Sequence, residues 1–302
     1  MPGRWRFSVI FLVTDRCNLN CPYCFLADRR SAANVPLERF REIIQRHRPL
    51  YLQLTGGEPT VHPQFEEMVR WCVRRPMLTQ FVTNGRGALP RIRFFEELRI
   101  RPLTAFSLDA AAPAVHDRIR GRRGLFDEIM EGVRFLRAIR APAALSAVVF
   151  GPGQVSTLPE GNLDQVRPLV RLARRLRLSI GIQPMNPSPL EVRRALAREL
   201  KRLRSPQVAG SPAFVRLLES PAPGPCLYNL THVSYGADGE ALPTSPGDCY
   251  FSDDCDDCFY ACVREPSVVF EGALLESAAH FARLSLRTLP GALRTPPLHS
   301  RA

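Results

Sequence analysis

Three cysteines stand close together near the start of the chain, in the stretch TDRCNLNCPYC, with the spacing C-x3-C-x2-C. Thiolates are the usual ligands of iron–sulfur clusters, and a cubane [4Fe-4S] cluster needs four points of attachment. Cys17, Cys21 and Cys24 supply only three, and the nearest histidines, His47 and His62, lie beyond the next predicted helix or strand. A structural zinc site would also require four ligands. The spacing therefore predicts a [4Fe-4S] cluster with one iron left for a ligand that is not protein.

Other candidate residues follow apolar stretches that have the pattern of β-strands. The motif GGEP, residues 56–59, ends the second such stretch. Its glycines let the backbone approach a ligand closely, and Glu58 offers a carboxylate or carbonyl beside a rigid proline. Asn84, Ser107 and Asp109 end the third and fourth stretches. For each of these residues a plain turn or helix cap is the alternative role.

The chain alternates strand-like and helix-like stretches that could hold these residues together. Strands are predicted at 6–13, 50–55, 78–84, 103–109, 144–150 and 178–185, and helices at 36–47, 63–74, 91–99, 124–140, 163–177 and 189–204. Strands this apolar predict a parallel sheet covered by helices, either an open doubly wound sheet or a partial barrel. In both folds, ligands bind at the carboxyl ends of the strands. We predict an α/β fold, a partial (β/α)6 TIM-like barrel with a small cysteine-rich C-terminal extension.

The alternation stops near Arg204, where proline, glycine and cysteine become more frequent. We predict a core over residues 1–205, a cysteine-rich segment with a terminal helix over 206–290, and a disordered tail over 291–302. Four cysteines of this segment could complete a metal site with no open position, and zinc and a second iron–sulfur cluster are both chemically reasonable. The candidate ligands are Cys226, Cys249, Cys255, Cys258 and Cys262. Cys72 lies on the apolar side of a predicted helix and is expected to be a buried core thiol.

The spacing C-x3-C-x-aromatic-C, with Tyr23 as the aromatic residue, and the GGEP motif together resemble the radical S-adenosylmethionine (radical SAM) superfamily. The resemblance covers about residues 5–190. It implies that the open iron of a [4Fe-4S] cluster binds the amino and carboxylate groups of SAM. It also implies reductive cleavage of SAM to a 5′-deoxyadenosyl radical, with an electron donor such as flavodoxin or ferredoxin.

The resemblance also implies contacts between SAM and particular residues. The GGEP segment would contact the amino group of SAM, and Arg118 or Arg120 in HDRIRG could bind its carboxylate bidentately. Val148 and Val149 could form a wall for adenine, or could belong to the core. No catalytic residue is assigned. The predicted cofactor contacts are Tyr23, Gly56, Gly57, Glu58, Pro59, Asn84, Ser107, Asp109 and Arg120.

The cysteine-rich segment resembles two types of radical SAM protein. CDDCFYACVREPSVV is similar to the C-terminal stretch of adenosylhopane synthase-type enzymes, and less closely to the SPASM and twitch proteins. The resemblance implies an auxiliary [4Fe-4S] cluster, with zinc as the alternative. Cys249 is surplus to the synthase pattern, so the architecture carries over better than the substrate. A small molecule, a peptide and a lipid stay open as substrates, as do hydrogen abstraction and radical addition.

The net charge of +12 suggests a nucleic-acid partner as an alternative. Lys201 is the only lysine among 41 basic residues, and the arginines are scattered over predicted helices. This distribution favours solvated helix faces. The alternative is a zinc or iron–sulfur protein that binds nucleic acid or modifies RNA. Because the chain lacks a groove pattern of interleaved aromatic and basic residues, we expect no nucleic-acid partner.

The apolar stretches are too short to cross a membrane. None approaches the roughly 20 apolar residues of a membrane span, and no cleavage site follows the first of them. We therefore expect a cytoplasmic protein in a reducing compartment, where the nine cysteines are better explained as ligands than as disulfides. The last predicted helix is expected to pack over the barrel rather than lie on a membrane.

Overall fold

The computed structural model describes residues 7–24, 26–27, 31–221, 232–245 and 248–249. The predicted ligands Cys226, Cys255, Cys258 and Cys262 lie outside these residues, as do the predicted terminal helix and tail. For Cys249 the backbone alone is described. The predicted boundary at 290 and the second metal site therefore stay predictions, and the boundary at 205 stays one as well.

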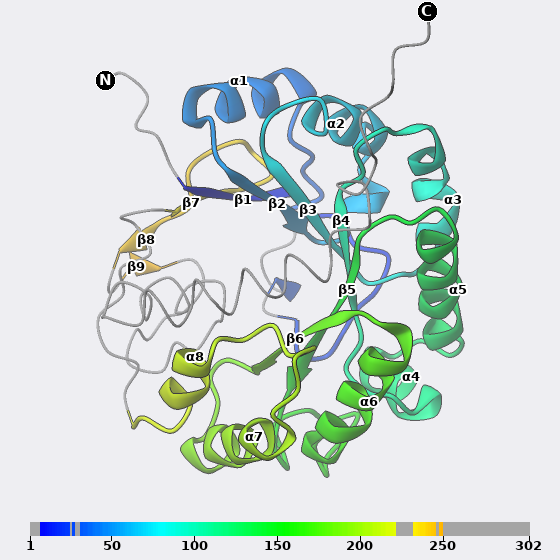
Figure 1. Ribbon diagram of the computed structural model, residues 1–302. Helices are drawn as coiled ribbons and strands as arrows, with labels where there is room; N and C mark the ends of the chain where they lie inside the picture. The colour runs from blue at the N-terminus through cyan, green and yellow to red at the C-terminus, as the bar shows by residue number, and fades with distance from the viewer. Residues whose placement is uncertain (1–6, 25, 28–30, 222–231, 246–247, 250–302) are drawn as a thin grey trace, which may run out of the picture.

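A curved parallel sheet forms the centre of the molecule, with the helices on its outer side (Figure 1). The order of the strands is β6-β5-β4-β3-β2-β1-β7, so β6 and β7 form its two edges. This arrangement confirms the predicted α/β partial barrel. The strands are β1 (Ser8–Thr14), β2 (Tyr51–Gly56), β3 (Leu78–Thr83), β4 (Leu103–Ser107), β5 (Ala143–Val149), β6 (Ser179–Pro184) and β7 (His232–Tyr235).

The seventh strand comes from the segment that we assigned to the cysteine-rich extension. β7 pairs in parallel with β1, with His232 opposite Ser8 and Tyr235 opposite Phe11. At four residues, HVSY is too short for its apolar pattern to identify it as a strand. It extends the sheet beyond the six predicted units. A short antiparallel pair follows, formed by β8 (Thr244–Ser245) and β9 (Asp248–Cys249).

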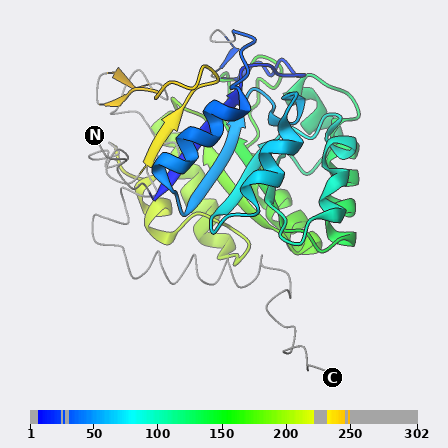
Figure 2. The same ribbon diagram turned by 90° about the horizontal axis from the view of Figure 1, so that it is seen from above.

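Helices cover the outer face of the sheet, and in Figure 2 α1 and α2 lie across the strands nearest to them. The predicted helix at 91–99 is instead the short α3 followed by a 3-10 turn at Arg93–Glu97. α4 was missed, although Pro113 at its start and Gly121 after its end, with φ of 67°, are ordinary helix boundaries. The helices are α1 (Leu37–His47), α2 (Phe65–Cys72), α3 (Ala88–Ile92), α4 (Pro113–Arg120), α5 (Leu125–Ala138), α6 (Val166–Leu176), α7 (Leu190–Leu203) and α8 (Pro212–Leu217).

Alternate residues of each strand face opposite sides of the sheet. Those facing the helices, such as Phe11, Leu54 and Phe81, are fully buried and form one continuous core. Cys72 belongs to this core and is fully buried, as predicted, and burial raises the pKa of its thiol. No helix in the part of the chain that the structure describes is long and apolar enough to cross a membrane.

The opposite face of the sheet lines the inside of the curve and carries polar residues interspersed with apolar ones. We call it the lumen face. On it, the hydroxyl of Tyr51 lies 2.8 Å from Oε1 of Gln80 and 3.2 Å from Oε1 of Gln53. The register of the seven strands places no charged side chain on this face among the described residues. Its half-buried polar residues include Tyr51, Gln53, Gln80, Ser107, Ser146 and Gln183.

Candidate functional site

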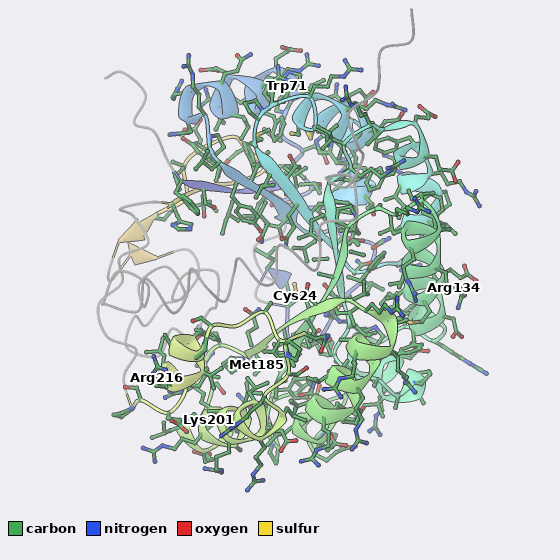
Figure 3. The ribbon with its side chains drawn as sticks, in the orientation of Figure 1. Cys24, Trp71, Arg134, Met185, Lys201 and Arg216 are labelled. Carbon is green, nitrogen blue, oxygen red and sulfur yellow. The ribbon has the colours of Figure 1, made fainter. Side chains whose placement is uncertain are left out.

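The residues predicted to bind the first cluster and SAM lie at the carboxyl ends of the strands. The three cysteines follow β1, GGEP follows β2, Asn84 follows β3 and Asp109 follows β4. Parallel strands bring these ends to one edge of the sheet. In Figure 3, Cys24 lies inside the curve of the strands together with Met185, which follows β6, whereas Arg134 and Lys201 belong to the outer helices.

The cysteine loop is closed at its base by contacts between its two ends. The hydroxyl of Thr14 donates to Oδ1 of Asn34 at 2.7 Å. The backbone N–H of Asp15 donates to the carbonyl of Ala33 at 3.0 Å. These contacts join the two ends of the segment that carries the three cysteines, at the end of β1.

The two glycines of GGEP allow this loop to approach the end of β2. A Cβ at Gly56 would lie 2.3 Å from the carbonyl oxygen of Thr14, and one at Gly57 would lie 2.1 Å from that of Arg16. The backbone N–H groups of Gly57 and Glu58 donate to these same two carbonyls, at 2.7 and 2.8 Å. The motif therefore holds the start of the cysteine loop, a role that sequence analysis did not anticipate.

Nitrogen donors point at two of the three cysteine sulfurs. Sγ of Cys17 accepts from the backbone N–H of Leu19 at 3.4 Å and from Nδ2 of Asn84 at 3.6 Å. Sγ of Cys21 lies 3.8 Å from Nη1 of Arg120. Such donors stabilise thiolate ligands, so the surroundings of these sulfurs fit an iron–sulfur cluster.

Burial also affects the first cysteine group. Cys21 is buried, while Cys17 and Cys24 are half-buried. Burial raises the pKa of the Cys21 thiol, and the charge of Arg120 partly offsets this effect. No three His, Cys, Asp or Glu side chains converge on a single metal-ion position within the described ranges. A cubane cluster does not require this, because each cysteine binds a different iron atom.

The carboxylate of Glu58 joins the ends of β2 and β3. Oε1 accepts from the hydroxyls of Thr60 and Thr83, at 2.6 and 2.8 Å, and from the backbone N–H of Thr60. Oε2 accepts from the backbone N–H of Asn84 at 2.6 Å. The carboxylate is fully buried, and this burial raises its pKa although the hydrogen bonds from Thr60, Asn84 and Thr83 act to lower it. Its side chain is thus engaged within the protein.

Asn84 connects β3 to the cysteine loop. Its Nδ2 donates to Oδ1 of Asn18 at 2.9 Å as well as contacting Cys17. Its Oδ1 accepts from the backbone N–H of Arg86 at 2.8 Å, and Nδ2 of Asn18 donates to the carbonyl of Arg86. Asn84 therefore lies beside Cys17, a predicted cluster ligand.

Asp109 and Arg120 form a buried ion pair beside Cys21. Nε of Arg120 donates to Oδ2 at 2.6 Å and Nη2 donates to Oδ1 at 3.1 Å. The hydroxyl of Tyr23 also donates to Oδ2. Burial acts to raise the pKa of Asp109, but the charge of Arg120 and these hydrogen bonds lower it overall. In contrast, Arg118 on the same helix is half exposed and pairs with Glu160.

Two further residues of this network were not predicted. Nδ2 of Asn162 donates to the carbonyls of Asp109 and Val148, at 3.0 and 2.9 Å. Nδ1 of His116 accepts the backbone N–H of Asp109 at 3.2 Å, and burial lowers the pKa of this imidazole to about 4. His116 stands in the HDRIRG stretch and could have been noticed there. Asn162 carries no local signal, because its partners are distant in the sequence.

The remaining predicted contacts occupy two faces of the sheet. Ser107 and Val148 are half-buried on the lumen face, where a ligand could reach them. Val149 is fully buried among the helices. Of these two valines, Val148 lies on the lumen face and Val149 belongs to the core.

Comparison with known sequences finds a matching family model and several similar proteins. Residues 11–156 match the model of the family described as the radical SAM superfamily. The chain is similar to the mycofactocin maturase MftC of Mycobacterium tuberculosis, with 29% identity over 58% of this chain and 44% of the relative. It is also similar to the antilisterial bacteriocin subtilosin biosynthesis protein AlbA of Bacillus subtilis, with 31% identity over 42% of this chain and 29% of the relative. The matches thus span less than half the length of these two relatives.

A solved structure shares the fold. Streptococcus suis SuiB bound to its precursor peptide SuiA superposes with a TM-score of 0.63. The sequence identity is 13%, and the match covers 89% of this chain and 66% of SuiB. The two proteins therefore share the partial-barrel fold although their sequences differ greatly.

Proposed function

Because the chain is a member of the radical SAM superfamily of enzymes, we propose that it binds a [4Fe-4S] cluster through Cys17, Cys21 and Cys24 and cleaves SAM beside it. The observation that carries this proposal is the loop geometry. Three cysteines follow β1 on one closed loop, and nitrogen donors point at the sulfurs of Cys17 and Cys21. When bound, the cluster supplies the electron that breaks a carbon–sulfur bond of SAM and makes a 5′-deoxyadenosyl radical available.

The residues around the loop divide into two groups. Glu58, Asp109 and Arg120 are buried and hydrogen-bonded to other parts of the protein, so their role is to support the residues around the cysteines rather than to contact SAM. Asn84 belongs to the same group, because it is buried and its amide is bonded to Cys17, Asn18 and Arg86. We assign the contact with SAM to the backbone of 56–59 and to the half-buried side chains of Tyr23 and Ser107. The protein's part is to orient the cofactor and to exclude water from it.

A peptide is the substrate class that fits best. SuiB binds a precursor peptide, and two relatives are named as a maturase and a bacteriocin biosynthesis protein. The lumen face carries amide and hydroxyl groups and, among the described residues, no charge. Such a surface suits the neutral hydrogen-bonding groups of a peptide better than a nucleic acid, whose phosphates require cationic partners.

We retain a second metal site in the proposal. Cys226, Cys255, Cys258 and Cys262, with Cys249 as a further candidate, have the residue types and spacing of an auxiliary [4Fe-4S] cluster, and zinc is the alternative. We also propose that the protein receives electrons from a donor such as flavodoxin or ferredoxin and acts in the cytoplasm.

The test is anaerobic purification followed by assay with SAM and dithionite. The protein should bind iron and sulfide and release 5′-deoxyadenosine, and Cys17→Ala, Cys21→Ala or Cys24→Ala should abolish that release. Cys72→Ala is the matched control, because its thiol lies in the core, and it should retain the cluster and the product. A zinc-loaded protein without iron, or release that survives the loss of all three cysteines, would refute the proposal.

A further inference from the structure

Arg120 connects a buried carboxylate to a predicted cluster ligand. Its guanidinium donates through Nε and Nη2 to the two oxygens of Asp109, while Nη1 lies 3.8 Å from Sγ of Cys21. Asp109 is fully buried and Arg120 is 9% exposed, so solvent screens this arrangement little. The cation therefore lies between the carboxylate and the sulfur.

The orientation of the guanidinium is fixed from several directions. A bidentate pair holds the guanidinium in the plane of its partner carboxylate. The carboxylate is itself held, because the backbone N–H of Val148 donates to Oδ1 at 3.0 Å and the hydroxyl of Tyr23 donates to Oδ2. With Nε and Nη2 occupied on one edge, Nη1 is directed towards Cys21.

We propose that Arg120 is a positioning residue that donates a hydrogen bond to the Cys21 thiolate and thereby makes the cluster easier to reduce. This inference rests on the proposed function. Reduction adds one electron, and so one negative charge, to a cluster that receives it from a one-electron donor. A cation and an N–H donor beside a ligand sulfur stabilise the reduced state and raise the reduction potential.

The negative charge of Asp109 does not cancel this effect. Because the carboxylate binds the guanidinium edge formed by Nε and Nη2, it lies on the far side of the cation from the sulfur. The sulfur therefore experiences the positive end of the pair. Asp109 acts through Arg120 by holding that end in place.

The experiment is an EPR-monitored redox titration of the reconstituted, cluster-loaded protein with dithionite and no SAM. Arg120→Met alone would leave Asp109 buried without a partner, so it is combined with Asp109→Asn to keep the protein folded. This double variant should lower the ratio of reduced to oxidised cluster at a given potential about tenfold, which is about 59 mV for a one-electron couple. Arg120→Lys keeps the charge but lacks the fork, and should show a smaller decrease.

Arg118→Met is the matched control, because Arg118 is on the same helix but pairs with Glu160 at the surface. Its potential should equal that of the wild type. The inference is overturned if the ratio of reduced to oxidised cluster in the double variant is within twofold of the wild-type ratio at the same potential. If the double variant does not load a cluster, the same result for Arg120→Lys overturns the inference. Failure of the proposed function would look different, because the wild-type protein would then hold no cluster to titrate.

Discussion

Glu58 and Asn84, which follow neighbouring strands, are joined by a hydrogen bond of 2.6 Å from the backbone N–H of Asn84 to Oε2 of Glu58. The side chain of Asn84 in turn contacts Sγ of Cys17. The acidic residue of GGEP is therefore linked to the cysteine loop through the end of β3. The GGEP motif, which we expected to face the cofactor, therefore also supports the loop that carries the predicted cluster ligands.

Glu58→Gln should destabilise the fold by about 1–3 kcal/mol, because an amide turned either way places its NH2 group against a backbone donor, that of Thr60 or that of Asn84. Urea unfolding at neutral pH measures the loss. Glu67→Gln, on an exposed residue, is the control and should have little effect. Equal unfolding midpoints for the two variants would contradict the buried role of Glu58.

Gly57→Ala should reduce both stability and iron content. A Cβ at this position would lie 2.1 Å from the carbonyl oxygen of Arg16, and relief of that clash must displace the start of the cysteine loop. We expect a loss of about 1–3 kcal/mol or more. Gly181→Ala is the control, since no atom lies within 4 Å of its added Cβ. Unaltered iron binding in Gly57→Ala would show that the close approach is dispensable.

His232 on β7 should make the fold sensitive to acid. Burial lowers the pKa of its imidazole from 6.5 to about 4, so the unfolded chain takes up a proton at a higher pH than the folded protein does. The stability is fully present above pH 6.5 and falls as the pH is lowered to about 4, by a total of about 3 kcal/mol.

His232→Gln removes this titration. The free energy of unfolding of the variant, measured with urea from pH 7.5 to 4.5, should fall less steeply than that of the wild type. His116, whose pKa is lowered to about 4 as well, is present in both proteins and cancels in the difference. Parallel pH profiles would mean that β7 does not bury a neutral imidazole.

Cys255→Ala and Cys258→Ala should separate the two proposed metal sites. We expect these variants to lose iron and sulfide, and to lose turnover of a peptide substrate, while SAM cleavage persists in part. The reason is that Cys17, Cys21 and Cys24, the proposed ligands of the first cluster, all follow β1 and lie far in the sequence from Cys255 and Cys258. Metal analysis and 5′-deoxyadenosine release, measured side by side with Cys21→Ala, check the prediction. Equal loss of SAM cleavage in both groups of variants would contradict it.

The sequence by itself determined the features that depend on residues close together in the chain. The spacing of Cys17, Cys21 and Cys24, the GGEP motif and the alternating apolar patterns each lie within a short stretch, so the fold class and the family could be predicted from them. Elements without such a local pattern were missed. β7 is only four residues long, and it is defined as a strand by its pairing with β1.

Tertiary structure decided how the polar residues are used. Arg118 and Arg120 look alike in sequence, yet only Arg120 lies on the buried face of α4, where it meets Asp109 and Cys21. Asn162 joins the same network from the segment after β5. These roles depend on which strand ends the parallel sheet brings together, because burial favours hydrogen bonds between the polar groups that are enclosed there.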